Sequence, residues 1–158
     1  MNPVFRWIES SALSVWTRES TSLLAYPAIL SAHAIGMGLV AGVSAAIALH
    51  LLGVAPEIPT VEMRRYAVVA WIGFALNAVS GMLLLIAYPT KALTNPLFYV
   101  KLSLVAVGLW LFIAVNKQLE KWTSVARLWL GISLLASWGG AIVAGRLLAY
   151  TYRRLMAG

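Results

Sequence analysis

The sequence predicts an all-α membrane protein, a polytopic four-helix bundle preceded by an N-terminal amphipathic helix at the membrane interface. Of its 158 residues, 61% are hydrophobic and only 11% are charged. Soluble domains carry about 25% charged residues, because a globule needs a polar surface. This composition excludes a soluble catalytic domain, a nucleic-acid-binding module and a disordered tail. The net charge of +7 comes from Lys and Arg residues at the edges of long apolar runs, which is typical of membrane flanks.

The first twenty residues predict a short amphipathic helix that lies in the interface. Apolar and charged side chains are interspersed there: Phe5, Trp7, Ile8, Leu13 and Trp16 with Arg6, Glu9 and Arg18. Because the charges interrupt any apolar core, we do not expect a cleavable signal sequence. The chain is therefore divided into an interfacial helix, 1–20, and a membrane domain, 21–158.

Four long intervals without a charged residue locate the membrane spans. They lie between Glu19 and Glu57, Arg65 and Lys91, Lys101 and Lys117, and Arg127 and Arg146. A helix needs about 20 apolar residues to cross a bilayer core. We expect four spans, at about 24–52, 66–88, 97–116 and 124–150, with both termini on the same side. The runs lack the alternating pattern of a membrane β-barrel.

Small residues on the first, second and fourth spans predict close helix packing, because glycine and serine let helix backbones approach in lipid. The surface around Gly42 also permits a homo-oligomer. The expected partners are therefore the lipid bilayer and either a second copy or a redox partner subunit, with no nucleic acid. The expected location is the bacterial inner (cytoplasmic) membrane.

Residue types and motifs that the sequence lacks exclude several kinds of cofactor site and enzyme. With no cysteine, the chain has no disulfide, no thiolate metal site and no covalently attached c-type haem. It has no nucleophile elbow, phosphate loop, zinc motif or acid–base dyad, so a hydrolase or a nucleotide enzyme lacks its residues. Whether the protein is an enzyme stays open at this point.

Polar side chains that a membrane makes costly gather in one half of the predicted bundle. His33 lies about 14 Å into the first span at helical rise. Helix directions place the following in the same half: Met37, Asn77, Ser80, Met82, Lys101 and Arg146. His50 falls at the opposite end. For His33, a ligand role and a buried hydrogen bond are equally open. The methionines are typical of core packing, and Asn77 and Ser80 are typical of interhelical hydrogen bonds. The two cations can extend their charged groups to the lipid headgroups, that is, snorkel.

Three stretches carry a resemblance to a known family: His33-Ala34-Ile35-Gly36, Asn95-Pro96 followed by Lys101-Leu102, and Gly145-Arg146 up to Tyr150. Over nearly its whole length the chain resembles a family of small, uncharacterised bacterial four-helix inner-membrane proteins. That family is similar to the CopD-like group, which includes copper-resistance proteins and the haem-dependent HemJ. The resemblance implies the fold and a shared histidine and lysine, matched by His33 and Lys101, and it does not carry over the oxidase activity of HemJ.

We therefore expect a b-type haem protein, acting in electron transfer or as a subunit of a redox complex. His33 supplies an axial nitrogen, since imidazole is the usual ligand of unattached haem. Lys101 and Arg146 neutralise the propionates, and Gly36 with the glycines of the fourth span makes room for the macrocycle. Met82 is a candidate sixth ligand.

Two alternatives stay open. His33, Met37 and Met82 form a nitrogen and thioether set that suits Cu(I), as in a copper-binding or copper-transport protein of CopD type. Because adjacent Lys101 and Arg146 would repel a metal cation, copper ranks second to haem. The third alternative is an accessory membrane subunit without a cofactor, in which His33 bonds a neighbouring carbonyl.

Overall fold

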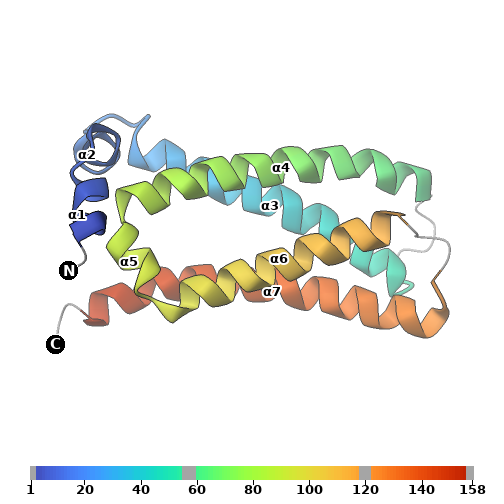
Figure 1. The fold of residues 1–158 in the computed structure, drawn as a ribbon. Coiled ribbons are helices and arrows are strands. Elements are labelled where there is room, and N and C mark those ends of the chain that lie inside the picture. Colours follow the sequence, from blue (N-terminus) through green and yellow to red (C-terminus); the bar gives the residue numbers. More distant parts are fainter. Residues whose placement is uncertain (1–2, 55–59, 118–121, 156–158) are drawn as a thin grey trace.

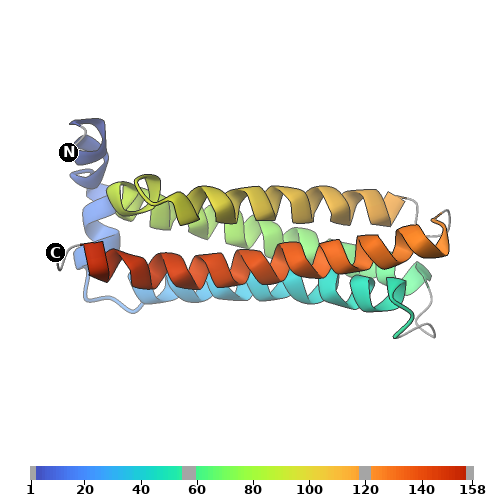
Figure 2. The ribbon, with the colours of Figure 1, turned by 90° about the horizontal axis from the view of Figure 1, so that it is seen from below.

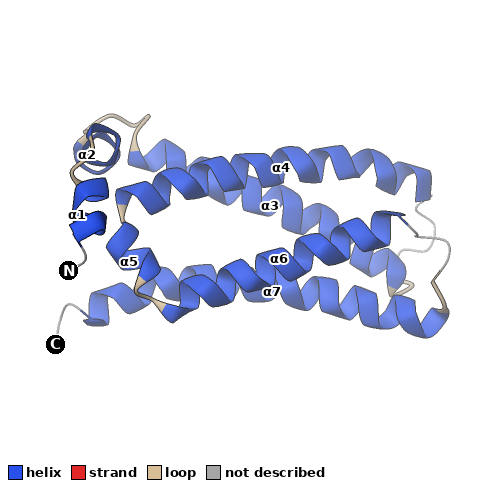
Figure 3. Cartoon of the chain, viewed as in Figure 1, coloured by secondary structure: helices blue, strands red, loops and turns tan. Residues whose placement is uncertain are grey.

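A computed structural model describes residues 3–54, 60–117 and 122–155, and the described chain consists of helices joined by short connections (Figures 1 and 3). The described residues form the helices α1 (Pro3–Glu9), α2 (Ala12–Glu19), α3 (Tyr26–Leu51), α4 (Thr60–Ala87), α5 (Pro89–Leu93), α6 (Pro96–Lys117) and α7 (Ser124–Leu155). The outermost residues of the two predicted domains, 1–2 and 156–158, lie outside the described residues.

Four helices are long and apolar enough to cross a membrane: Tyr26–Leu51, Arg65–Ala87, Pro96–Lys117 and Ser124–Thr151. Each agrees with a predicted span to within a few residues, and the protein is a multi-pass membrane protein with an all-α four-helix bundle. The uncharged intervals locate the helices because a charge inside the bilayer core costs several kcal/mol.

The helix ends follow local rules. Gly53, just after α3, has a φ of +76°, a left-handed conformation that glycine adopts without steric cost. At the other end of the bundle, Pro89 begins α5 and Pro96 begins α6. The side-chain oxygen of Asn95 accepts a hydrogen bond from the Leu97 backbone N–H (3.0 Å), which caps α6.

The two termini lie at the same end of the bundle, as the even number of spans predicts (Figures 1 and 2). We call this the terminal end. The opposite end, where α3 and α6 end and α4 and α7 begin, is called the loop end.

The helices pack in pairs, α3 with α4 and α6 with α7, and α3 also packs against α7. Gly36 and Gly73 allow the closest approach. A Cβ atom on Gly36 would lie 2.6 Å from the Asn77 backbone nitrogen and 2.7 Å from the Gly73 carbonyl oxygen. Glycine is therefore required where α3 crosses α4. From the sequence, Gly36 was expected to make room for a cofactor, but in the structure it lies against the backbone of α4 at this helix crossing.

The hydrophobic core occupies the middle of the bundle and its loop end. Its largest fully buried members are Val40 and Ile47 on α3, Phe112 on α6 and Leu134 on α7. Met37 belongs to the same cluster. On each long helix, one buried member of this core lies nearest the terminal end: Met37 on α3, Ala70 on α4, Leu111 on α6 and Trp138 on α7. The terminal half of the bundle is therefore less completely filled.

The N-terminal segment forms two short helices where the sequence predicts one. The chain breaks at Ser10 and Ser11, and the Ser11 hydroxyl caps α2 by accepting a hydrogen bond from the Ser14 N–H (3.3 Å). Ser14 and Thr17 are buried against the bundle, while Trp7 and Trp16 are exposed. The apolar side chains thus point outward, as expected of an interfacial segment whose surroundings include lipid.

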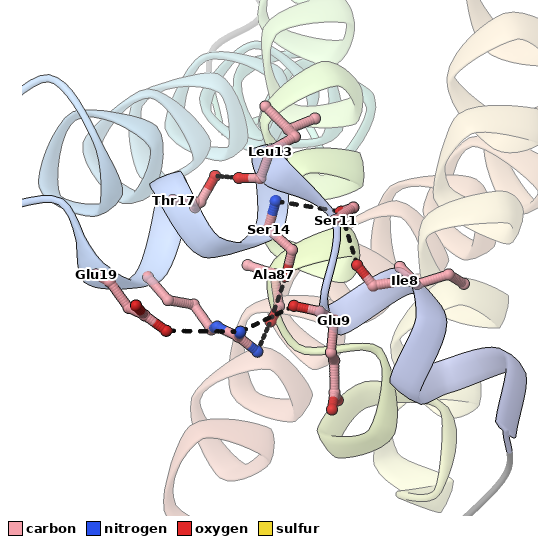
Figure 4. A network of polar contacts seen from close by, with 9 residues as sticks. Ile8, Glu9, Ser11, Leu13, Ser14, Thr17, Glu19 and Ala87 are labelled. Carbon is pink, nitrogen blue, oxygen red and sulfur yellow. Dashed lines mark hydrogen bonds and ion pairs between the residues drawn. The ribbon is translucent and has the colours of Figure 1, made fainter.

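Three hydrogen bonds tie this segment to the junction of α4 and α5, and two of them are drawn in Figure 4. The buried carbonyl of Ala87, at the end of α4, accepts from the Ser14 hydroxyl and from Arg18 Nη1, both at 3.4 Å. Arg18 Nη2 also donates to the Glu9 carbonyl (2.9 Å), and the Glu9 carboxylate accepts from the Thr90 N–H (3.3 Å). These bonds satisfy backbone groups that helix ends leave without partners.

Replacing Arg18 by methionine should loosen this junction. The substitution leaves Ala87 with the Ser14 contact alone, and the loss of a charged donor to a buried carbonyl costs about 1–2 kcal/mol. Amide hydrogen exchange across residues 88–94 should accelerate in detergent-solubilised protein. Arg6→Met is the matched control, because Arg6 is exposed. Equal exchange in both variants would show that the N-terminal segment does not hold α5.

Candidate functional site

A cavity of about 470 Å³ lies in the terminal half of the bundle, between α3, α4, α5, α6 and α7. Its volume falls within the range of about 300–1,000 Å³ that is usual for small-molecule sites. The walls are mostly apolar and include the aromatic rings of Phe74 and Phe98. Among the described residues that line it, the charged ones are Lys91 and Lys101, and none is acidic. The cavity therefore favours an apolar ligand that carries negative charge.

His33 on α3 is fixed in one tautomer by its contacts. Its Nδ1 lies 3.0 Å from the backbone carbonyl oxygen of Asn77 on α4. A carbonyl oxygen only accepts, so Nδ1 carries the proton and donates it. The other ring nitrogen, Nε2, then has a lone pair, and it lies 3.1 Å from Lys101 Nζ on α6. His33 thus links three helices.

The Asn77 side chain makes a second contact with α3. Its side-chain nitrogen donates to the His33 carbonyl oxygen (2.8 Å), so each residue bonds the backbone of the other. Ser80 Oγ lies 3.2 Å from His33 Nδ1 and donates to the Leu76 carbonyl (2.6 Å). Asn77 and Ser80 are buried. These contacts hold the imidazole in one orientation, with Nε2 turned away from α4.

Two glycines provide the space for this pair. A Cβ atom on Gly81 would lie 3.1 Å from His33 Cε1, and one on Gly145 would lie 3.6 Å from the Lys101 side chain and 3.7 Å from its Nζ. Gly81 lies four residues after Asn77 on α4, and therefore faces the same side of the helix. The small residues of α4 and α7 thus border the polar pair.

The structure brings together some of the predicted site residues and separates others. His33, Met82 and Lys101 line the cavity. Arg146 is exposed on α7 and is not among the lining residues, although the preceding residue, Gly145, is. Met37 is buried in the hydrophobic core.

His50 is buried near the loop end of α3, seventeen residues beyond His33. At 1.5 Å per residue this separation is about 25 Å. His50 is not among the residues that line the cavity. Its position agrees with the expectation that it cannot join the polar residues around His33.

Lys91 is a charged lining residue that was not predicted from the sequence as part of the site. It lies on α5, and its Nζ is 5.9 Å from the centre of the Tyr88 ring. Tyr88 in turn packs edge-on against Tyr26, with ring centres 6.0 Å apart, and both tyrosines line the cavity. The available signal was a lysine between Pro89 and Asn95-Pro96, inside a short connection that sequence patterns describe only as a loop.

The arrangement supplies one imidazole nitrogen with a lone pair, two lysines and mostly apolar walls. These groups suit a metal-centred or hydrogen-bonding ligand with an anionic part. Within the described residues, no three histidine, cysteine, aspartate or glutamate side chains gather to hold a bare metal ion. Comparison with protein-family models, with curated proteins and with solved structures gives no match.

Proposed function

We propose that the protein binds b-type haem in the bacterial cytoplasmic membrane and acts in electron transfer or as a subunit of a redox complex. The observation that carries this proposal is the orientation of His33, which lines a mostly apolar cavity: Nδ1–H donates to the Asn77 carbonyl, and Nε2 keeps a lone pair that faces Lys101 Nζ. Metal-ligating histidines characteristically donate their second ring N–H to a carbonyl or carboxylate. Membership of the CopD-like and HemJ-like group, through His33 and Lys101, is part of the proposal.

The cavity residues fit a haem. His33 Nε2 is the candidate axial ligand, and the absence of cysteine from the sequence makes attachment non-covalent. Phe74 and Phe98 provide aromatic walls for a flat macrocycle. Bound haem would supply one-electron redox chemistry, while the chain supplies the ligand, its orientation and the exclusion of water.

Lys101 has two uses in this site. It donates to the lone pair of Nε2 in the structure (3.1 Å), and it would release that lone pair to a haem iron held by His33. The lysine side chain is flexible and carries three donors. Its amino group can then turn to a carboxylate, which replaces the lost hydrogen bond in a low-dielectric setting where ion pairs are strong.

Copper ranks second, because only two of its three proposed ligands, His33 and Met82, line the cavity. Met37 packs in the core. Two lysines in the same cavity would also oppose the binding of a metal cation. An accessory subunit without a cofactor would use His33 only for its hydrogen bonds.

Absorption spectroscopy of the protein purified in detergent, after expression with sufficient haem supply, tests the proposal. We expect a Soret band, visible bands that sharpen on reduction, and a pyridine adduct typical of haem b. Colourless protein with stoichiometric copper by elemental analysis would replace haem by copper. Colourless protein that neither contains copper nor binds added haem would leave the accessory subunit.

A further inference from the structure

We propose that Lys91, and not Arg146, binds a carboxylate of the haem together with Lys101, so that the haem lies with its carboxylate edge toward the terminal end of the bundle. This inference rests on the proposed function and adds to it the orientation of the ligand and the residues that select for its carboxylates.

The first support is the distribution of charge around the cavity. Lys91 and Lys101 line it, and within the described part of the chain no acidic residue does. Arg146 is exposed on α7. These two lysines give the lining a positive charge, and a ligand with two carboxylates matches that charge.

The second support is depth. His33 is seven residues after the start of α3 and Lys101 five after the start of α6, about 10 Å and 7.5 Å at helical rise. Lys91 lies on α5, which connects the terminal ends of α4 and α6. A macrocycle whose central metal is bound by His33 can therefore extend one edge to Lys91. The core beyond Met37 blocks the opposite direction.

The third support is the way Lys91 is held. A helix of five residues is not stable by itself, yet α5 begins at buried Pro89 and its Thr90 N–H donates to the Glu9 carboxylate (3.3 Å). The Tyr88 ring lies beside the Lys91 amino group. The N-terminal segment thus positions α5, and with it the cationic Lys91 that lines the cavity.

The experiment compares haem with haem dimethyl ester, in which both carboxylates are neutralised. Each is titrated into the ligand-free protein in phosphatidylcholine nanodiscs, with empty nanodiscs as the background. We expect the wild type to bind haem about tenfold or more tightly than the ester, because charge-assisted hydrogen bonds are strong in a low-dielectric site.

Lys91→Met should reduce this preference several-fold and leave the affinity for the ester unchanged, which also shows that the variant is folded. Lys101→Met should reduce it too, and the double variant should abolish it. Arg146→Met is the matched control and should keep the wild-type preference. A preference that survives Lys91→Met, or that disappears in Arg146→Met, would overturn the inference and leave haem binding intact. Wild-type protein that binds neither porphyrin would reject the proposed function and this inference together.

Discussion

Replacing His33 by alanine should remove the Soret band or lower haem affinity about 100-fold or more. His33 Nε2 is the only imidazole nitrogen with a lone pair among the described residues that line the cavity, and axial ligation by imidazole is the main bond that holds unattached haem. The measurement is the haem titration of the variant in nanodiscs, together with its spectrum after purification.

His50→Ala is the matched control and should retain the wild-type spectrum, because His50 lies at the other end of α3. The circular dichroism of both variants shows whether the helices persist. If the wild type binds haem and His33→Ala keeps both spectrum and affinity, His33 is not the ligand, even though haem would be the correct cofactor.

Replacing Gly36 by alanine should destabilise the bundle by about 3 kcal/mol, because overpacking at a tight contact forces the helices apart. The added Cβ would meet two backbone atoms of α4 at 2.6 Å and 2.7 Å, and backbone atoms cannot rotate out of the way. Separation of α3 from α4 should also break the contacts between His33 and Asn77. The unfolding free energy is measured by SDS titration in mixed micelles.

Gly38→Ala provides a matched control on the same helix. A Cβ atom added to Gly38 would meet no atom within 4 Å outside its own helix backbone, and alanine favours a helix by about 1 kcal/mol relative to glycine. This variant should be as stable as the wild type or slightly more stable. Equal destabilisation of the two variants would mean that the crossing at Gly36 is looser than described.

The spans and the depth of the polar residues could be predicted from sequence, because both depend on position along the helices. Charges mark where helices leave the bilayer, and a rise of 1.5 Å per residue places His33 and Lys101 at similar depths. Both residues lie near the starts of α3 and α6, which run in the same direction from the terminal end. For this reason the fold and the shared depth of His33 and Lys101 could be predicted, whereas their contact could not.

The face on which each residue lies was harder to predict. Gly145 and Arg146 are neighbours, yet only Gly145 lines the cavity, because one residue turns a helix by about 100°. In an apolar helix the polar pattern that would reveal the buried face is weak. The position of Lys91 depends on contacts between α5 and the distant N-terminal segment, which no local pattern encodes.

The uneven filling of the bundle has a consequence for its assembly in the cell. Val40, Ile47, Phe112 and Leu134 join α3, α6 and α7 without any ligand, and helices that are already inserted can associate through such packing. The polypeptide can therefore be inserted and assembled before the proposed haem is bound. Under this order of events, synthesis of the membrane protein need not be synchronised with cofactor supply, and a pool of ligand-free protein can wait in the bilayer for loading.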